Sequence, residues 1–325
     1  MKIGLFYLAT PKYGGWVTFT SHLYRSLHRI GCQVYLFKIS KRTEPNQRPF
    51  CDGIKYQNID IETAKGMAEQ FPTIVTASDK NYAIETKTLL ANGANVVIHD
   101  PTEMKGELLE TVRENGIKPI TIREVNVKNL AEAGVDSTYV KHPYLRFNDD
   151  PKPKTELAVA TSRIDFDKHT DIIIEANKSL KREIKIFGAE NRLYGFHKLD
   201  QIDRRWRRNY YGRFQGRFGE VFKILNPSKY MIDMSAIKKD GGGSQYTFLE
   251  GWDAGCVLIL NRDWGIGDSD VMKENHNCLY AQNAAELIDL LNRDEKHDEI
   301  VEAGYAGLKE FEGESIARQY MKLVA

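Results

Sequence analysis

The sequence predicts an α/β protein made of two doubly wound domains, and three observations support this prediction. Short apolar runs alternate along the 325 residues with helix-length amphipathic segments. Several of these runs are continuous rather than alternating, which is typical of parallel strands buried on both faces. A polar segment with two prolines interrupts the alternation near the middle of the chain, after which it begins again.

The first series of elements begins with an apolar run over 2–8, which we expect to be a buried strand. The segment over 17–30 carries apolar residues at helical spacing, and Gly31 follows it as a typical helix end. Strand alternating with helix predicts a parallel sheet. Its further strands are expected at 33–39, 53–59, 73–77, 95–99, 118–122 and 137–140.

The second series begins after the polar segment over 148–154, which we interpret as a linker. We therefore place one domain at 1–147 and a second at 148–307, and a helix over about 308–325 is a candidate to pack back on the first. Ligands of such domains bind at the carboxyl ends of the strands. Strands are expected at 156–160, 183–187, 209–214, 230–234 and 256–260, with helices around 171–180, 219–225 and through Glu250.

Composition and charge exclude several classes of protein. Lys plus Arg total 46 against 45 for Asp plus Glu, and the resulting net charge of +1 excludes a globally basic, histone-like binder. No run of 18 apolar residues occurs, and Pro11 and Lys12 break the apolar N-terminus, so neither a membrane span nor a signal peptide is expected. The four cysteines form no CxxC pair, which predicts reduced thiols, a cytoplasmic protein and no structural zinc site.

The loop after the first expected strand ends in the glycine pair Gly14-Gly15. Such a pair between a strand and a helix lets the backbone approach a ligand closely, and the helix N-terminus favours a phosphate. The pattern is not GxGxxG, so the fingerprint of a nicotinamide-type cofactor is absent. A tight strand-to-helix turn without a ligand is the alternative interpretation.

Arg163 and Lys168 follow the first expected strand of the second domain. Arginine can bind a diphosphate through a bidentate fork, and lysine can bind it as a point charge. The alternative is a solvated charged loop.

A glycine-rich segment over 239–245 leads into the helix that carries Glu250. Consecutive glycines before a helix expose backbone N–H groups to an anion. Glu250 lies one turn inside an otherwise apolar helix face, where a carboxylate is costly unless it has a partner. A ribose diol fits, because two hydroxyl donors meet two acceptor oxygens, and a structural ion pair is the alternative. Further candidate nucleotide-sugar contacts at the helix start are Gly243, Ser244, Gln245 and Tyr246.

These segments together resemble the GT-B glycosyltransferases, and within them the retaining group that includes sucrose- and trehalose-forming enzymes. Members carry an early glycine pair, an Arg and a Lys after the entry strand of the second domain, and a Glu-x7-Glu segment ending in E-A-x-A-x-G-x-P-V. This chain matches with Gly14-Gly15, with Arg163 and Lys168, and with the segment over 250–257. The resemblance implies two Rossmann-like domains that face each other across a cleft, an N-terminal acceptor-side domain and a C-terminal nucleotide-sugar-binding domain.

The resemblance also implies roles for individual residues. Glu250 corresponds to the glutamate that holds the ribose, and His99-Asp100 corresponds to the catalytic edge of the cleft, near the donor sugar and the acceptor. A lone histidine after a strand is otherwise a hydrogen-bonded loop residue. The first glutamate of the family's pair falls on Gly242, so the chain departs from the family where the donor sugar is contacted, and the identity of that sugar stays open.

The segment over 204–217 holds six arginines and no acid, with aromatic residues between them. Arginines on phosphates and aromatics stacked on an extruded base are what DNA binding needs, whereas a solvated loop beside a core strand is the alternative. The segment over 244–250 and His99-Asp100 also resemble the T4-type bacteriophage DNA α-glucosyltransferases, which glycosylate hydroxymethylcytosine in phage DNA. The candidate DNA contacts are Arg204, Arg205, Arg207 and Arg208.

We therefore expect a glycosyltransferase (EC 2.4) that moves a sugar, with retention, from a nucleoside-diphosphate sugar to a hydroxyl. The resemblance implies a UDP-sugar as the commonest donor. No metal or other cofactor is expected, because Arg163, Lys168 and the helix N-termini would stabilise the diphosphate and no Asp-x-Asp motif lies in a suitable loop. The leading acceptor is a 5-hydroxymethylpyrimidine in double-stranded phage DNA, which would place the protein in the host cytoplasm. A saccharide, lipid or small-molecule acceptor is one alternative. A non-catalytic nucleotide- or DNA-binding protein of the same fold is another, and Gly242 favours it.

Overall fold

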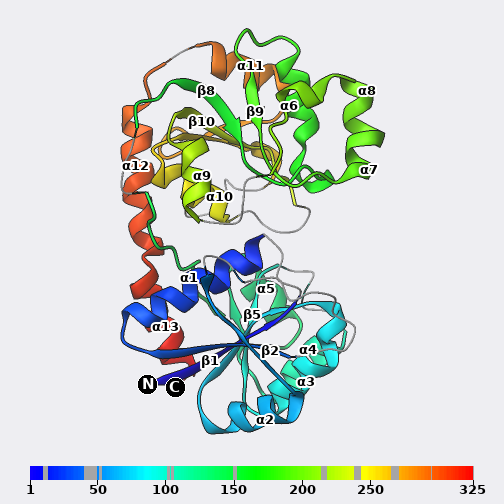
Figure 1. Ribbon diagram of the computed structural model, residues 1–325, viewed down its shortest axis with the longest axis vertical. Coiled ribbons are helices and arrows are strands. Elements are labelled where there is room, and N and C mark those ends of the chain that lie inside the picture. Colours follow the sequence, from blue (N-terminus) through cyan, green and yellow to red (C-terminus); the bar gives the residue numbers. More distant parts are fainter. Residues whose placement is uncertain are drawn as a thin grey trace. The chain divides into compact units, whose positions relative to one another are not determined.

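The computed structural model describes residues 1–9, 14–39, 50, 53–100, 103, 106–148, 152–213, 218–237, 243–264, 271–293 and 295–324. The chain divides into two compact units (Figure 1). The N-terminal unit is Met1–Leu145 with Glu310–Ala325, and the C-terminal unit is Arg146–Lys309.

The N-terminal unit is built on a parallel sheet whose described strands follow the order β3-β2-β1-β4-β5-β6-β7. The chain moves outward from β1 to one edge and then crosses back to continue from β4 toward the other edge. The sheet is therefore doubly wound, with its switch point between β1 and β4. Its strands are β1 (Lys2–Leu8), β2 (Gln33–Ile39), β3 (Gln57–Ile59), β4 (Thr73–Ser78), β5 (Asn95–Ile98), β6 (Ile120–Thr121) and β7 (Thr138–Tyr139).

Helices cover this sheet because each presents an apolar face to it. In α1, for example, Phe19, Leu23 and Leu27 are fully buried, at the spacing of one helix face. The central strands β1 and β4 are buried on both faces, as their continuous apolar runs predict, whereas the edge strands β3 and β7 are not. The helices are α1 (Gly15–Arg29), α2 (Ile61–Gln70), α3 (Ala83–Ala91), α4 (Glu107–Glu114), α5 (Glu124–Glu132) and α13 (Gly313–Val324).

Helix α13 comes from the other end of the chain and lies beside α1 (Figure 1). The ring of Tyr320 is fully buried, with its centroid 6.1 Å from that of Phe19. A Cβ atom on Gly313 would lie 2.3 Å from Ser26 Oγ, so only glycine allows this close approach. The N–H of Gly313 donates to the carbonyl of Tyr144 at 2.9 Å. The N-terminal unit therefore includes a helix that is distant from it in sequence.

The C-terminal unit is a second parallel sheet, with the described strands in the order β12-β11-β10-β8-β9. These are β8 (Glu156–Ala160), β9 (Ile184–Ile186), β10 (Ser228–Asp233), β11 (Val257–Asn261) and β12 (Leu279–Ala281). Its helices are α6 (Thr170–Asn177), α7 (Arg192–Tyr194), α8 (Asp200–Ile202), α9 (Phe218–Leu225), α10 (Tyr246–Asp253), α11 (Ala284–Asn292) and α12 (Asp298–Leu308). Both units are thus parallel α/β domains, as the sequence predicts.

The strand expected over 209–214 is wrong for the described residues of that segment. A 3-10 turn over Trp206–Asn209 includes the first residue of the expected strand. Tyr210 then makes only an isolated bridge to Ile186. The carboxylate of Asp203 accepts the N–H of Arg205 at 2.8 Å, which fixes the turn, and the buried Trp206 ring then anchors it. Local hydrogen bonding therefore outweighs the apolar pattern here.

Among the described residues, no helix combines the length and the apolar character that crossing a membrane requires. Cys32, Cys256 and Cys278 are free and buried. Cys51 lies outside the described residues.

Candidate functional site

The strand order of the C-terminal unit creates a switch point between β8 and β10. The chain passes from β8 to β9 on one side and returns to β10 on the other. In open α/β sheets, ligands bind beyond the carboxyl ends of the strands at such a point. A ligand site is therefore expected in the segments that follow β8 and β10.

Lys168 lies in the segment after β8, and its side chain is buried, with 7% of the residue exposed. Its Nζ donates to Ser235 Oγ at 2.9 Å and to Gln245 Oε1 at 3.0 Å. The Asp167 carboxylate is 3.9 Å away, beyond hydrogen-bond distance. Because an ammonium has three donors and the described residues accept two of them, the third suits a bound anion.

Arg163 lies in the same segment, with 54% of its side chain exposed. Its guanidinium donates to Asp165 at 3.0 Å and to Asp167 at 3.3 Å. These bonds use two of the five guanidinium donors. The structure therefore holds Arg163 against the acids of its own loop rather than against Gln245 and the start of α10.

The N-terminus of α10 has no side-chain cap. Gln245 occupies the N-cap position, and its Oε1 accepts from Lys168, so its Nε2 is the free end of the amide. That Nε2 atom is buried and has no hydrogen-bond partner among the described residues. An unpaired buried donor costs about 1–3 kcal/mol, which an acceptor oxygen of a ligand would recover.

The residues before Gln245 are partly described. Gly243 has φ of 98°, in the left-handed region that favours glycine, and Ser244 is buried, as is Tyr246 on the first turn of α10. Residues 238–242 lie outside the described part of the chain. The prediction that Gly242 replaces the family's first glutamate in this site thus stays a prediction.

Glu250 is half-buried on α10, and its carboxylate makes no hydrogen bond or ion pair with a described residue. Burial, followed by the nearby carboxylate of Asp253, raises the pKa of Glu250 to about 8. Asp253 differs because Arg146 Nε donates to its Oδ1 at 2.6 Å. The structural ion pair considered as the alternative for Glu250 is therefore absent among the described residues.

Asp233 and Ser235 also belong to this site, although neither is predicted from the sequence. Asp233 is the last residue of β10, and both side chains are almost completely buried. Ser235 is the direct partner of Lys168. A lone acid at the end of an apolar strand, YMID, was the available signal. We name Lys168, Ser235, Gln245 and Glu250 the α10 cluster.

In the N-terminal unit, the glycine pair stands at the start of α1. Gly14 is the N-cap residue with φ of 151° and ψ of −179°, and no side chain caps the helix. A Cβ atom on Gly14 or Gly15 would meet no atom of the described part of the chain within 4 Å. The loop residues 10–13 lie outside the described part of the chain. The exposed helix N-terminus itself suits an anion.

His99 lies directly after β5 and is 7% exposed. Its Nε2 lies 2.7 Å from the carbonyl oxygen of Thr76, and because a carbonyl only accepts, Nε2 carries the hydrogen. Burial lowers the pKa of His99 to about 4, which makes the ring neutral at pH 7. Its Nδ1 is then an acceptor, suited to a hydroxyl group but too weak a base to take up a proton at pH 7.

A carboxyl group joins His99 to the start of α1. Glu103 accepts the N–H of His99 at 2.8 Å through one oxygen and the indole N–H of Trp16 at 3.0 Å through the other. Burial, followed by the nearby carboxylate of Asp100, raises the pKa of Glu103 to about 8. The structure thus brings Gly15 and His99, predicted separately, to one edge of the sheet. Glu103 is a residue of this edge that the sequence does not predict.

The arginine run divides into paired and unpaired residues. Arg207 donates to Glu190 at 2.7 Å and to Asp200 at 2.9 Å, and it lies over the Trp206 ring at 4.6 Å. Arg208 lies 3.7 Å from the Asp203 carboxylate. Arg204 and Arg205 are exposed and make no side-chain hydrogen bond or ion pair with a described residue. Arg204 and Arg205 therefore carry positive charge that no described acid neutralises and that suits a polyanion.

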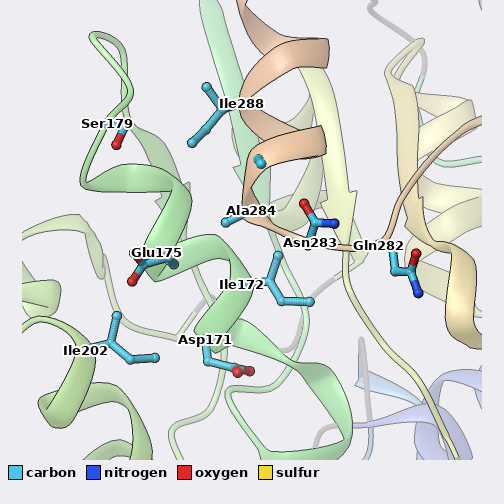
Figure 2. Close-up of a pocket in the computed structure, with 10 residues that line it drawn as sticks. Asp171, Ile172, Glu175, Ser179, Ile202, Gln282, Asn283, Ala284 and Ile288 are labelled. Carbon is cyan, nitrogen blue, oxygen red and sulfur yellow. The ribbon is translucent and has the colours of Figure 1, made fainter.

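A hollow of about 570 Å³ on the C-terminal unit is lined by α6, α8 and α11 (Figure 2). Ile172, Ile202 and Ile288 provide apolar surface, and Asp171 and Glu175 carry negative charge. No lysine, arginine or histidine is among its described lining residues. The positive charge of Lys168 therefore makes the α10 cluster a more favourable place for an anionic nucleotide than this hollow.

No protein-family model matches the chain, and no curated protein sequence matches it either. Solved structures match over nearly the whole chain. An α-glucosyltransferase in complex with UDP and a 13-mer DNA containing an HMU base has a TM-score of 0.74 at 15% identity, covering 100% of this chain and 99% of that one. The Anabaena protein Alr3699/HepE in complex with UDP and glucose has a TM-score of 0.73 at 11% identity, covering 99% and 98%.

A glycosyltransferase from Rickettsia africae ESF-5 matches with a TM-score of 0.70 at 13% identity, covering 99% of this chain and 97% of that one. At this level of identity such similarity establishes the fold. The predicted GT-B fold, with two Rossmann-like parallel α/β domains, is confirmed. That the two domains face each other across a cleft stays a prediction.

Proposed function

We propose that this chain is a glycosyltransferase that takes a sugar from a nucleoside-diphosphate sugar. The observation that supports the proposal most strongly is the arrangement of the α10 cluster. A buried ammonium stands at the start of the helix beside an amide N–H that has no partner among the described residues. A carboxylate that no described residue pairs follows one turn along the helix. A diphosphate needs the first pair, and a ribose diol needs the carboxylate.

Further residues predicted from the sequence are proposed to contact the nucleotide-sugar donor. Gly243, Ser244 and Tyr246 surround the helix start, where backbone N–H groups favour a phosphate. Arg163 is exposed beside its two acids, and it would exchange them for the diphosphate. In the N-terminal unit, Gly14-Gly15 would present a helix N-terminus to an anion. UDP is the nucleotide we propose, because the α-glucosyltransferase and the Anabaena protein bind it.

The proposed transfer leaves the configuration of the anomeric carbon unchanged. The bond from that carbon to the diphosphate breaks, a bond to the acceptor oxygen forms, and the hydroxyl proton passes to the departing phosphate. Lys168 and the N-terminus of α10 stabilise the negative charge on the leaving group, without a metal or other cofactor. The neutral His99, beside Asp100, would accept a hydrogen bond from a hydroxyl of the sugar or of the acceptor. This bond would orient the hydroxyl without removing the hydroxyl proton.

For the acceptor we propose a 5-hydroxymethylpyrimidine in double-stranded DNA. The support is the charge of Arg204 and Arg205, which no acid among the described residues pairs, together with the similar α-glucosyltransferase that was solved with DNA. Saccharide, lipid and small-molecule acceptors are the alternative, and the similar Anabaena protein was solved with UDP and glucose. If the acceptor is phage DNA, the protein works in the host cytoplasm.

The experiment that tests the function is a turnover assay with UDP-sugars, with and without duplex DNA that contains hydroxymethylcytosine. Release of UDP that requires the modified DNA supports the whole proposal. Slow donor hydrolysis that DNA does not change keeps the enzyme class and rejects the DNA acceptor. No binding of any nucleotide sugar overturns the enzyme proposal and leaves a non-catalytic protein of this fold.

The variant with Arg204→Ala and Arg205→Ala is expected to bind DNA more weakly and with less dependence on salt. If each arginine contacts one phosphate, the slope of log K against log salt becomes shallower by about 1.8. The measurement is a fluorescence-anisotropy titration of labelled duplex at several salt concentrations.

The matched control for this prediction is the variant with Arg207→Ala and Arg208→Ala. Their guanidiniums face Glu190, Asp200 and Asp203, so the expected loss is in the free energy of unfolding rather than in the salt slope. Equal salt slopes for the two double variants and the wild type would contradict the assignment of Arg204 and Arg205.

A further inference from the structure

Asp233 is a buried carboxylate at the switch point of the C-terminal sheet, and the proposed reaction does not use it. It ends β10, and 1% of the residue is exposed. Burying an ionised carboxylate is costly unless hydrogen-bond donors compensate it. The donors around Asp233 therefore indicate its role.

Four donors surround the carboxylate. Its Oδ1 accepts the backbone N–H of Ser235 at 2.9 Å and also the Ser235 hydroxyl. Its Oδ2 accepts the hydroxyl of Ser162 and, at 3.2 Å, that of Thr247. A carboxylate has about four lone-pair sites, so these donors fill it. Asp233 has no site left for a ligand hydroxyl, a substrate proton or a metal, which excludes a direct catalytic role.

The donors come from the three segments that meet at the switch point. Ser162 follows β8, Ser235 follows β10, and Thr247 lies in the first turn of α10. One carboxylate therefore holds together the loop that carries Lys168 and the helix that carries Gln245 and Glu250.

Ser235 extends this effect to the ammonium of Lys168. Because its hydrogen points at Asp233, the lone pairs of its oxygen are turned away from Asp233, and one accepts from Lys168 Nζ at 2.9 Å. A serine rotated the other way would direct its hydrogen at the ammonium. The charge of Asp233 thus fixes the only orientation of the hydroxyl that can hold Lys168.

We propose that Asp233 is the positioning residue of the diphosphate end of the donor site, acting through Ser235 on Lys168. This inference rests on the proposed function of the α10 cluster. It adds that the affinity for the diphosphate, but not for the nucleoside, depends on a carboxylate that never touches the ligand.

The test is calorimetric binding of UDP and of uridine to the wild type and to Asp233→Asn. Asparagine keeps the shape but loses the charge and turns a donor toward two of the four hydrogens. UDP binding is expected to weaken roughly 10-fold or more, the loss of about one charge-assisted hydrogen bond, while uridine binding stays within roughly 2-fold. Ser235→Ala leaves Asp233 in place and is expected to give the same split, which keeps the test valid if Asp233→Asn does not fold.

Ser162→Ala is the matched control, because it removes a donor of Asp233 that has no bond to Lys168. Its UDP affinity is expected to fall less than that of Ser235→Ala, because Asp233 keeps its charge and its contacts with Ser235. Unchanged UDP binding in both Asp233→Asn and Ser235→Ala overturns the inference alone, and a parallel loss of UDP and uridine also overturns it by marking a merely structural role. No UDP binding by the wild type overturns the proposed function and this inference with it.

Discussion

At a pH above 8, where the Glu250 carboxyl is ionised, Glu250→Gln is expected to weaken UDP binding roughly 10- to 100-fold, the range for losing charge-assisted hydrogen bonds to a ligand. The carboxylate has no partner among the described residues, so both of its oxygens are available to a ribose diol. Glutamine keeps one acceptor oxygen and turns a donor toward the second hydroxyl. Calorimetric titration with UDP measures the effect, and 2′-deoxy-UDP should bind wild type and variant with more similar affinities.

The same substitution is expected to raise stability in a pH-dependent way. The pKa of Glu250 rises from 4.5 to about 8 because of its burial, so the folded state retains a proton that the unfolded chain releases. This residue therefore costs stability increasingly as pH rises from about 4.5 to 8, and glutamine removes that cost. Thermal unfolding of both proteins at several pH values should show a difference that grows across this range. Glu103 is present in both proteins and cancels in the comparison.

Glu175→Gln is the matched control for both measurements, because that glutamate is exposed on α6 and pairs with Lys178. It should change neither UDP affinity nor the pH dependence of unfolding by a measurable amount. A Glu250→Gln protein that binds UDP as tightly as the wild type would remove the ribose assignment.

Lys168→Met is expected to lower kcat by about 10²–10³, the usual effect of removing one donor that stabilises a developing anion. The ammonium is buried and held by Ser235 and Gln245, so it is in place before charge develops on the diphosphate. Methionine replaces the stem with a side chain of similar volume. Steady-state turnover with a saturating UDP-sugar measures kcat separately from KM.

Lys178→Met is the control for this prediction, since it removes an exposed lysine from the same unit. It should leave kcat unchanged. If Lys168→Met raised KM alone and kept kcat, the lysine would bind the ground state and transition state equally. The proposed stabilisation of the leaving group would then be wrong.

The sequence predicts the strands well because buried parallel strands are continuous apolar runs, as in 73–77 and 230–234. It also singles out Glu250, since a carboxylate on an apolar helix face is conspicuous without any alignment. The segment over 209–214 fails for a local reason. Its aromatics look like a strand, but the Asp203 side chain fixes a turn just before it.

The remaining residues of the site depend on partners that are distant in sequence. Arg207 belongs to a run without acids, yet Glu190 and Asp200 neutralise it after folding. Asp233 and Ser235 matter because the topology places them beside Ser162 and Lys168. Periodicity along the chain carries no information about such contacts.

The place of α13 in the N-terminal unit has a consequence for how the chain acquires its structure during synthesis. The ribosome completes the first sheet early, but the face of α1 that receives Tyr320 stays uncovered until residues 313–324 have been made. The unit begun first is thus finished last, and the nascent chain carries an apolar surface throughout translation of the second unit. A fragment cut at Leu145 would keep that surface permanently and would be prone to aggregate.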